Sequence, residues 1–582
     1  MIKLLKNMRR REMGMALACL VLVVAQVYFD LRLPDYMTQL TVLIKTSGTT
    51  GEILHIGLQM LGCALASALL AVGCGYLAAK TAAGFSFAVR EKLFHHVMDI
   101  GSEEMQDFSV PSLITRTTND VTQIQMIVAM GLQMVLKAPI MAVWAIAKIL
   151  GKSWQLSAVT AAFVVAICIA MLLIMGSCIP RFRLVQKMTD AINRVARENL
   201  TGINVVHAFN AEDFQNQKFD GPSRGMMELQ MKNQKLFALV QPIMTLGMNG
   251  LALAIYWLGA ALVNALAEPA ARLTLFSEVL VFSTYATYIV MSFMMLTMII
   301  MFLPQAQVSA ERINEVLERP ASIREGTAEQ GTQRGTVEFR DVSFRYPHAG
   351  EDELSHISFR VEQGETLAII GATGSGKTTL VSLIPRFYDA TQGQVLVDGV
   401  DVKDYTFDAL YDKLGYVTQK AVLFSGSVRD NVFFGRSSAA DDDAALRSAI
   451  DLAQASEFVD KLPEGTDYRI AQMGRNVSGG QKQRVAIARA LARRPEILIF
   501  DDSFSALDYR TDAKLREGLE HSLRDTTKII VAQRISTIRH ADKIIVLDRG
   551  EAVGMGTHEE LMNSCDVYRE IALSQLSASE LA

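Results

Sequence analysis

Hydrophobic and polar positions divide the chain into two parts with different patterns. The first part contains six long apolar segments, at about residues 13–45, 53–80, 127–150, 154–180, 237–266 and 276–303. Each reaches the roughly 20 residues that an α-helix needs to cross about 30 Å of hydrocarbon. The fourth segment carries no charge between Trp154 and Pro180, which is rare for a helix in a soluble core. The pattern predicts six membrane-spanning helices.

The connections between these segments indicate how the chain is oriented. Those at 46–52, 151–153 and 267–275 are short, whereas those at 81–126 and 181–236 are long, together carry most of the Lys and Arg of these segments and connections, and are helix-forming in composition. Since positive charge marks the cytoplasmic side of a span, we expect the long connections to be helical extensions in the cytoplasm. The basic residues 1–12 would form an elbow helix on the same side. A basic start before an apolar run also fits a secretory signal, an alternative that five further spans make poor.

The pattern changes after residue 319, where the predicted transmembrane domain (13–319) ends. Residues 320–336 are polar, begin with a proline and lack periodicity, which is typical of a linker. Residues 337–582 read as an ordinary soluble domain. Overall net charge is only −4, so the chain lacks the basic footprint of a nucleic-acid-binding protein. The cysteines have no spacing typical of a metal site or a disulfide framework, and we interpret them as packing residues.

The first motif of the soluble domain that indicates a chemical function is rich in glycine. The stretch "LAIIGATGSGKTTL" is a short apolar run followed by glycines, a lysine and a threonine. Such a loop lets backbone N–H groups approach phosphates, while the lysine reaches the β- and γ-phosphates and the hydroxyl ligates Mg²⁺. The residues expected to bind ATP here are Gly371, Ala372, Thr373, Gly374, Ser375, Gly376, Lys377, Thr378 and Thr379. A second apolar run, "ILIF", ends in Asp501, where a magnesium-binding aspartate belongs.

Further motifs resemble those of ABC transporters. "NVSGGQKQRVAIARAL" resembles the signature segment of their ATPase domains, "SALD" the D-loop, Gln419 the Q-loop glutamine, and Tyr346 in "VSFRYP" the aromatic residue that stacks on adenine. "ITRTTNDV" and "ENLTGINVVHAFNAEDF" resemble the cytoplasmic loops that dock on these domains. Six spans before one such domain is the order of the exporter half-transporters. The resemblance covers nearly the whole chain.

This resemblance implies an architecture and a site. The fold would be an all-α six-helix transmembrane domain followed by an α/β P-loop nucleotide-binding domain at 337–582. ATP and Mg²⁺ would be the cofactors, with Thr378, Gln419 and Asp501 at the metal. In this family the signature contacts ATP held by the opposite subunit, so each site combines two chains. The residues implied for that contact are Ser478, Gly479, Gly480, Gln481 and Asp508.

Two positions depart from the family pattern. Asp502 stands where hydrolysing relatives usually carry a glutamate, and it is shorter by one C–C bond, about 1.5 Å. Gln533 stands where the family usually carries a histidine that contacts the γ-phosphate, and an amide cannot carry its positive charge. Gln472, before the signature, is a weaker third departure. With the SGGQ sequence intact, the chain resembles the degenerate-site subunit of bacterial heterodimeric multidrug exporters, although Asp502 alone could be a tolerated variant.

The membrane segments give weaker indications about cargo. In the sixth segment Met291, Met294, Met295, Met298 and Met301 recur at helical spacing, and flexible thioethers suit a surface that binds varied apolar ligands; ordinary helix packing is the alternative. Asp30 in the first segment is a candidate cavity residue, since charges at membrane depth usually face a cavity or each other. An ion pair with Arg32 is the alternative reading, and Lys137 is expected to snorkel to the inner interface.

The sequence thus predicts a multi-pass protein of the cytoplasmic membrane, with its N-terminus and nucleotide-binding domain in the cytoplasm. It would export amphipathic small molecules by ATP-driven alternating access, paired with a second half-transporter chain. Its own P-loop site would hydrolyse ATP weakly. A dedicated peptide or lipid exporter, and a non-transporting ATP-gated sensor, are the alternatives.

Overall fold

The chain divides into two compact units. In the computed structural model, residues 1–45, 48–150, 152–435 and 442–575 are described; the predicted connections 46–52 and 151–153 therefore lie partly outside the described residues. The helical unit contains Met1–Met98 and Val110–Arg319, and the sheet unit contains Asp99–Ser109 and Pro320–Ala582.

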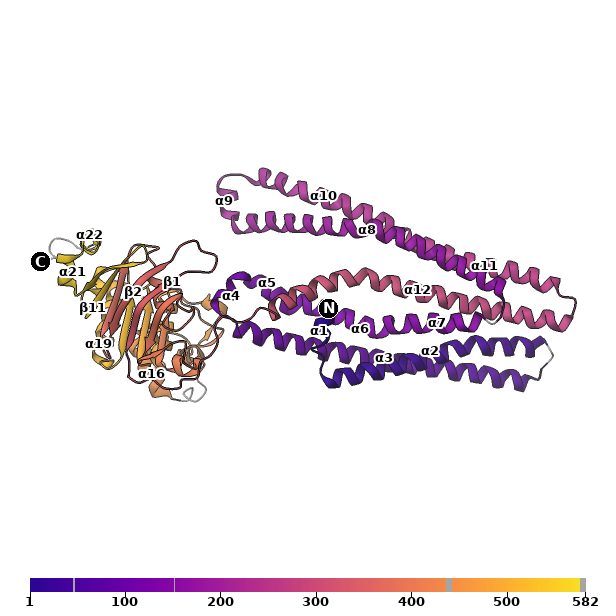
Figure 1. Ribbon diagram of the computed structural model, residues 1–582, viewed down its shortest axis with the longest axis horizontal. Helices are drawn as coiled ribbons and strands as arrows, with labels where there is room; N and C mark the ends of the chain where they lie inside the picture. The colour runs from indigo at the N-terminus through magenta and orange to yellow at the C-terminus, as the bar shows by residue number, and fades with distance from the viewer. Residues whose placement is uncertain (46–47, 151, 436–441, 576–582) are drawn as a thin grey trace. The chain divides into compact units, whose positions relative to one another are not determined.

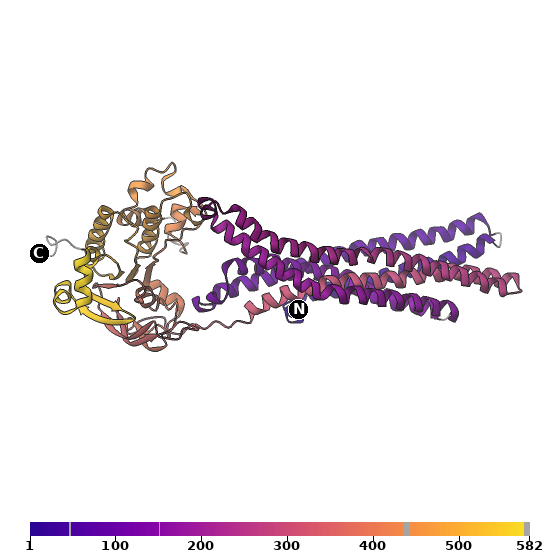
Figure 2. The same ribbon diagram turned by 90° about the horizontal axis from the view of Figure 1, so that it is seen from above.

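The helical unit consists mainly of long helices that run in roughly the same direction, together with a few short helices (Figures 1 and 2). They are α1 (Ile2–Leu5), α2 (Arg10–Lys45), α3 (Thr50–Asp99), α5 (Val110–Thr115), α6 (Val121–Met130), α7 (Leu136–Leu150), α8 (Trp154–Thr201), α9 (Ile203–Ala208), α10 (Glu212–Ala238), α11 (Val240–Ala265) and α12 (Pro269–Leu317). Two π-helical turns, η1 (Arg116–Asp120) and η2 (Gly131–Val135), join α5, α6 and α7.

Six of these described segments are long and apolar enough to cross a membrane. This confirms the six predicted spans, and the long connections at 81–126 and 181–236 are largely helical, as their composition indicates. The sixth span, within α12, is the most enclosed, with 50% of its apolar window buried against 11% in α3. Figure 1 shows α8 and α10 side by side, joined at α9, diverging from α12 and its neighbours.

The sheet unit is built on two main sheets. One is four-stranded and antiparallel, in the order β2-β1-β4-β5; the other is six-stranded, in the order β12-β11-β3-β10-β9-β6, and parallel except for β12. The strands are β1 (Val337–Phe344), β2 (Leu354–Val361), β3 (Thr366–Gly371), β4 (Gln392–Val397), β5 (Val400–Asp401), β6 (Leu414–Val417), β7 (Gly426–Ser427), β8 (Arg469–Ile470), β9 (Ile497–Asp501), β10 (Thr527–Val531), β11 (Lys543–Asp548) and β12 (Glu551–Gly556). β7 and β8 pair separately.

Helices cover the six-stranded sheet and fill the connections between its strands. They are α13 (Lys377–Ser382), α14 (Phe407–Lys413), α15 (Val428–Val432), α16 (Asp443–Leu452), α17 (Ser456–Val459), α18 (Gly479–Ala492), α19 (Tyr509–Ser522), α20 (Ile535–Ile538), α21 (His558–Ser564) and α22 (Asp566–Gln575), with the 3-10 turns η3 (Gly465–Asp467) and η4 (Gln472–Gly474). The short helix α4 (Ser102–Asp107), which follows α3 in the chain, also belongs to this unit. The six-helix unit and this α/β unit together confirm the predicted fold class.

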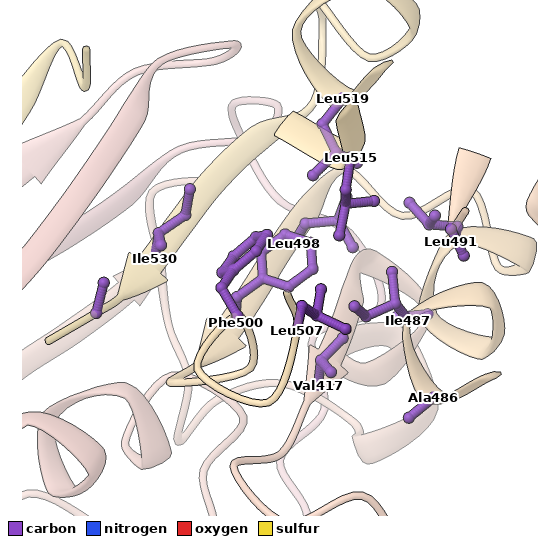
Figure 3. Close-up of a cluster of buried hydrophobic side chains, with 14 of the residues drawn as sticks. Val417, Ala486, Ile487, Leu491, Leu498, Phe500, Leu507, Leu515, Leu519 and Ile530 are labelled. Atoms are coloured by element: carbon purple, nitrogen blue, oxygen red, sulfur yellow. The ribbon is translucent and has the colours of Figure 1, made fainter. Parts of the chain in front are cut away.

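The sheet unit's core places two helices against one strand. On β9, Leu498 and Phe500 lie on one face because side chains alternate along a strand. They pack with Ile487 of α18 and Leu515 of α19 in one buried cluster, shown in Figure 3. The packing fixes the helices that begin at the signature and at the D-loop relative to the strand that ends in Asp501.

Strand register brings the residues predicted to form the ATP site to one edge of the sheet. Val531 on β10 pairs with Ile369 on β3 and with Asp501 on β9, while Phe500 pairs with Val417 on β6. The carboxyl ends of these four parallel strands, β3, β10, β9 and β6, therefore lie together. The segments that follow them carry the P-loop, Asp502, Gln533 and Gln419, residues that lie far apart in the sequence.

Candidate nucleotide-binding site

The glycine-rich loop joins β3 to α13 and is shaped for phosphate groups. Gly376 caps α13 with φ 92°, a left-handed conformation that favours glycine, and an added Cβ would meet the Leu354 side chain at 2.7 Å. The ammonium of Lys377 donates hydrogen bonds to the carbonyl oxygens of Gly371 at 2.9 Å and Ala372 at 2.7 Å. Burial lowers the pKa of Lys377. The loop thus holds a cation within a ring of backbone groups.

Asp501 and Thr378 provide oxygens suited to Mg²⁺. The Thr378 hydroxyl donates to Asp501 Oδ1 at 2.9 Å, and Asp501 is only 3% exposed. Burial raises the pKa of Asp501, and the nearby Thr378 and Tyr416 hydroxyls oppose that shift. A carboxylate beside a hydroxyl is a ligand pair that Mg²⁺ prefers. The donor set fits the ion, and Tyr416 is a neighbour that the sequence motifs did not identify.

Asp502 is held by two amides. Its Oδ2 accepts a hydrogen bond from Gln533 Nε2 at 2.8 Å and a longer one from Gln419 Nε2 at 3.3 Å. The backbone is left-handed at Asp502, with φ 45°, and its N–H donates to the Val531 carbonyl at 3.1 Å. The side chain is 6% exposed. The two departures from the family pattern, Asp502 and Gln533, therefore contact each other.

A cavity of about 190 Å³ lies at this strand edge. Its lining includes Thr373, Gly374, Gly376, Lys377, Thr378, Thr379, Gln419, Asp502 and Gln533, all candidate site residues from the sequence. Glu353 and Val531 also line it and were not predicted. Val531 belongs to β10 and carried no motif, but its place before Ala532 and Gln533 could have indicated it. Glu353 precedes β2, and no sequence signal singled it out.

Tyr346 lies at the side of the P-loop helix. Its hydroxyl and the Thr379 hydroxyl are 2.9 Å apart. Its ring makes edge contacts with Phe344 and Tyr388, at centroid distances of 4.9 and 5.4 Å. The half-buried ring is therefore fixed next to the loop, in a position suited to stacking on a base.

The signature residues lie apart from this cavity. Ser478 caps α18 in a capping box: its hydroxyl accepts from Gln481 N at 3.4 Å, and Gln481 Oε1 accepts from Ser478 N at 2.8 Å. Gly479 is exposed beside Ser478, and Asp508 caps α19 by accepting from Thr511 N at 3.0 Å. None of the signature residues Ser478, Gly479, Gly480 and Gln481 lines the P-loop cavity, nor does Asp508. They form a second, outward-facing surface.

Asp30 pairs with a residue that the sequence did not suggest. Its Oδ2 lies 3.1 Å from Lys137 Nζ, and Ser67 donates to its Oδ1 at 2.5 Å. The predicted partner Arg32 instead donates to the Tyr28 hydroxyl at 2.7 Å. The alternative Asp30–Arg32 pair is therefore wrong, because helix packing places Asp30 on α2 against Lys137 on α7. The expected position of Lys137 near the inner interface stays a prediction.

The methionine positions divide between core and surface. Met291 and Met294 pack against the buried cluster of the helical unit, whereas Met298 is 49% exposed. Met295 is partly exposed, and the side chain of Met301 lies outside the described part of the structure. A substrate role for Asp30 and for these methionines stays a prediction.

Comparison with known families places both parts of the chain. Residues 16–293 match the ABC transporter transmembrane region, and residues 354–505 match the family described as ABC transporter. An uncharacterized ABC transporter ATP-binding protein of Mycobacterium tuberculosis is 39% identical over 91% of both chains. A lipid A-core flippase of Aromatoleum aromaticum is 32% identical over 86% of this chain and 82% of its own length.

A solved structure has the same fold. The chain is similar to a bacterial Atm1-family ABC exporter with ATP bound, with a TM-score of 0.82. The likeness covers 98% of this chain and 99% of that one, at 24% sequence identity.

Proposed function

Because the chain belongs to the ABC transporter family, we propose that it is the degenerate-site subunit of a heterodimeric exporter of amphipathic small molecules. As a half-transporter with an ABC ATPase domain, it is a multi-pass membrane protein in which ATP drives export. The proposal adds a division of labour between two chains. This P-loop site would bind Mg²⁺-ATP and turn it over slowly, and the signature would complete a faster site on the partner.

The hydrogen bonds to Asp502 carry this proposal. A general base must reach the attacking water, and the shorter side chain withdraws the carboxylate by about 1.5 Å. A displacement of about 1 Å costs on the order of 100-fold in a positioned reaction. The same Oδ2 atom also accepts two amide hydrogen bonds, from Gln533 and Gln419. Both features disfavour water activation while leaving Lys377, Thr378 and Asp501 free to bind Mg²⁺-ATP.

The signature geometry supports the other half of the proposal. The exposed start of α18 presents Ser478 and backbone N–H groups, and the N-terminus of a helix favours anions. The buried α18–β9 packing fixes this surface (Figure 3). A γ-phosphate on the partner's P-loop would meet it without any change in this chain.

An exposed apolar tip supports a dimer. At the α8–α9–α10 turn, Leu200 is 76% exposed and Phe209 is 79% exposed. In the membrane orientation predicted from the sequence this tip lies in the cytoplasm, where such side chains need a partner surface. We propose that it docks on a nucleotide-binding domain.

The decisive experiment compares two substitutions in the purified heterodimer. Asp502→Asn removes the carboxylate of this chain's own site, and Ser478→Arg places a bulky cation on the signature surface. We expect Asp502→Asn to retain most steady-state ATPase activity and Ser478→Arg to lose nearly all of it. Loss of a working general base costs about 10²- to 10⁴-fold, so equally complete loss in both variants would refute the asymmetric site.

A dedicated lipid exporter is the second candidate, because one relative is named a lipid A-core flippase. Reconstituted vesicles separate the two. Transport of several unrelated dyes supports the multidrug proposal, whereas strong ATPase stimulation by one lipid alone supports the second candidate. ATPase activity without vectorial movement of any dye or lipid would support a sensor instead.

A further inference from the structure

A cavity of about 450 Å³ lies between α11 and α12 in the helical unit, and none of its lining residues belongs to the ATP site. Its apolar wall includes Ala260, Val263, Val279 and Leu280, and its polar lining includes Arg272 and Asn264. The helices approach closely at its base: a Cβ added at Gly259 would meet Val279 at 2.5 Å. An apolar channel with a cationic end suits an amphiphile that has an acyl chain and an anionic head.

Two cations gather at the polar end. Arg272 lies in the first turn of α12 and donates through Nε to the Leu266 carbonyl at 2.6 Å. Lys45, at the end of α2, has its ammonium 4.2 Å from the centroid of the Phe276 ring, which also lines the cavity. Neither side chain forms an ion pair with another described residue, and both are exposed. The amino end of α12 adds a partial positive charge.

The depth of the site matches a lipid headgroup. α12 has 49 residues, about 73 Å at 1.5 Å per residue, and its carboxyl end leads to the nucleotide-binding domain. Arg272 therefore lies on the opposite side of the membrane, where the apolar span beginning at Ala271 starts. On α11, Trp257 is 77% exposed and Tyr256 is 44% exposed. Aromatic side chains of this kind mark the membrane–water interface.

We propose that this cavity binds one anionic phospholipid from the leaflet opposite to the nucleotide-binding domain. The phosphate would lie between Arg272 and Lys45, and an acyl chain would follow the apolar wall between α11 and α12. The lipid would be a bound ligand of the transporter, distinct from its cargo. This inference does not depend on the proposed substrate or on the asymmetric ATP site.

Native mass spectrometry of the delipidated full-length transporter tests the site. The probes are dioleoyl phosphatidylglycerol and dioleoyl phosphatidylcholine, titrated separately. We expect tighter binding of phosphatidylglycerol, and a loss of on the order of fivefold for each cation removed in Arg272→Gln and Lys45→Gln. Lys152→Gln is the matched control, because Lys152 is exposed in the connection after the third span, on the same side, and does not line the cavity.

A second variant tests the apolar wall. Ala260→Phe fills the channel and should weaken binding of both lipids without changing the preference between them. The proposal is overturned if the wild-type protein shows no headgroup preference, if the preference survives in the Lys45→Gln/Arg272→Gln double variant, or if Ala260→Phe leaves both affinities unchanged.

Discussion

At the scale of single residues, the ATP site is distinguished by the hydrogen bonds that Asp502 accepts from two side-chain amides. A glutamate with a histidine neighbour would extend the carboxylate toward water and replace one amide donor by a group that can carry charge. Here Gln533 donates to Asp502 at 2.8 Å. The two departures from the family pattern are therefore hydrogen-bonded to each other, a contact that the separate motifs do not reveal.

Restoring both residues should raise turnover at this site. We expect Asp502→Glu with Gln533→His to increase steady-state ATPase activity, because recovering about 1 Å of reach is worth on the order of 100-fold at the affected site. The measurement is ATPase activity of the purified heterodimer that also carries Ser478→Arg, which silences the other site. No increase over Ser478→Arg alone would show that the partner's signature, rather than Asp502, limits this site.

Tyr346 should contribute to ATP affinity through its ring. The edge contacts with Phe344 and Tyr388 fix the ring independently of its hydroxyl. We therefore expect Tyr346→Phe to bind ATP almost normally and Tyr346→Ala to bind at least about fivefold more weakly, since stacking on a base is worth about 1–3 kcal/mol. Fluorescent-nucleotide titration in the Ser478→Arg background measures it. Equal affinities for the two variants would contradict stacking.

At the scale of secondary-structure elements, ion pairs join helices within the membrane. Lys137 on α7 contacts Asp30 on α2, and Lys148 on α7 lies 2.7 Å from Asp35 on α2. Tyr285 on α12 donates to Asp35 at 2.6 Å. Charges in a span are costly unless paired, so these contacts restrict how α2, α7 and α12 pack.

Removing one partner of the Asp30–Lys137 pair should lower the free energy of unfolding more than removing both charges. We expect Lys137→Met to destabilise the protein by about 3–5 kcal/mol, because Asp30 is left unpaired where the pair is mostly buried. Adding Asp30→Asn should recover much of the loss. Thermal melting in detergent measures both, with Lys218→Met as the control, since its exposed pair with Glu198 is worth about 1 kcal/mol or less. A double variant no more stable than the single one would contradict the expectation.

At the scale of the whole molecule, α12 carries the methionines predicted to contact cargo, and its carboxyl end leads to the nucleotide-binding domain. Met298 is exposed and Met294 packs on the core of the helical unit. We expect Met298→Ala to change drug-stimulated ATPase activity unevenly between drugs and to leave basal activity intact. Met227→Ala is the control, because Met227 on α10 is also exposed. A uniform loss that follows protein yield would mean that Met298 only packs.

The proposed assembly has a direct test. A tagged chain extracted in mild detergent should retain a second half-transporter in equal amount, identified by mass spectrometry. That partner should carry the glutamate and histidine missing here. Recovery of this chain alone, as an active homodimer, would contradict the division of labour.

The sequence by itself determined the six spans, the α/β class of the second unit and the ATP-binding family. These conclusions depend on local features of the sequence. The length of an apolar run determines whether a helix can span the membrane. The P-loop and the signature are each one contiguous segment, because a loop and the start of a helix bind phosphate through their own backbone N–H groups. Tertiary structure alone decided that Asp502 meets Gln533, 31 residues away, and that Lys148 meets Asp35, 113 residues away. Strand order and helix packing determine which distant residues come into contact, and the local pattern of the sequence does not predict those contacts. For the same reason, the sequence offered Arg32 as an alternative partner for Asp30, whereas in the folded helices Asp30 contacts Lys137.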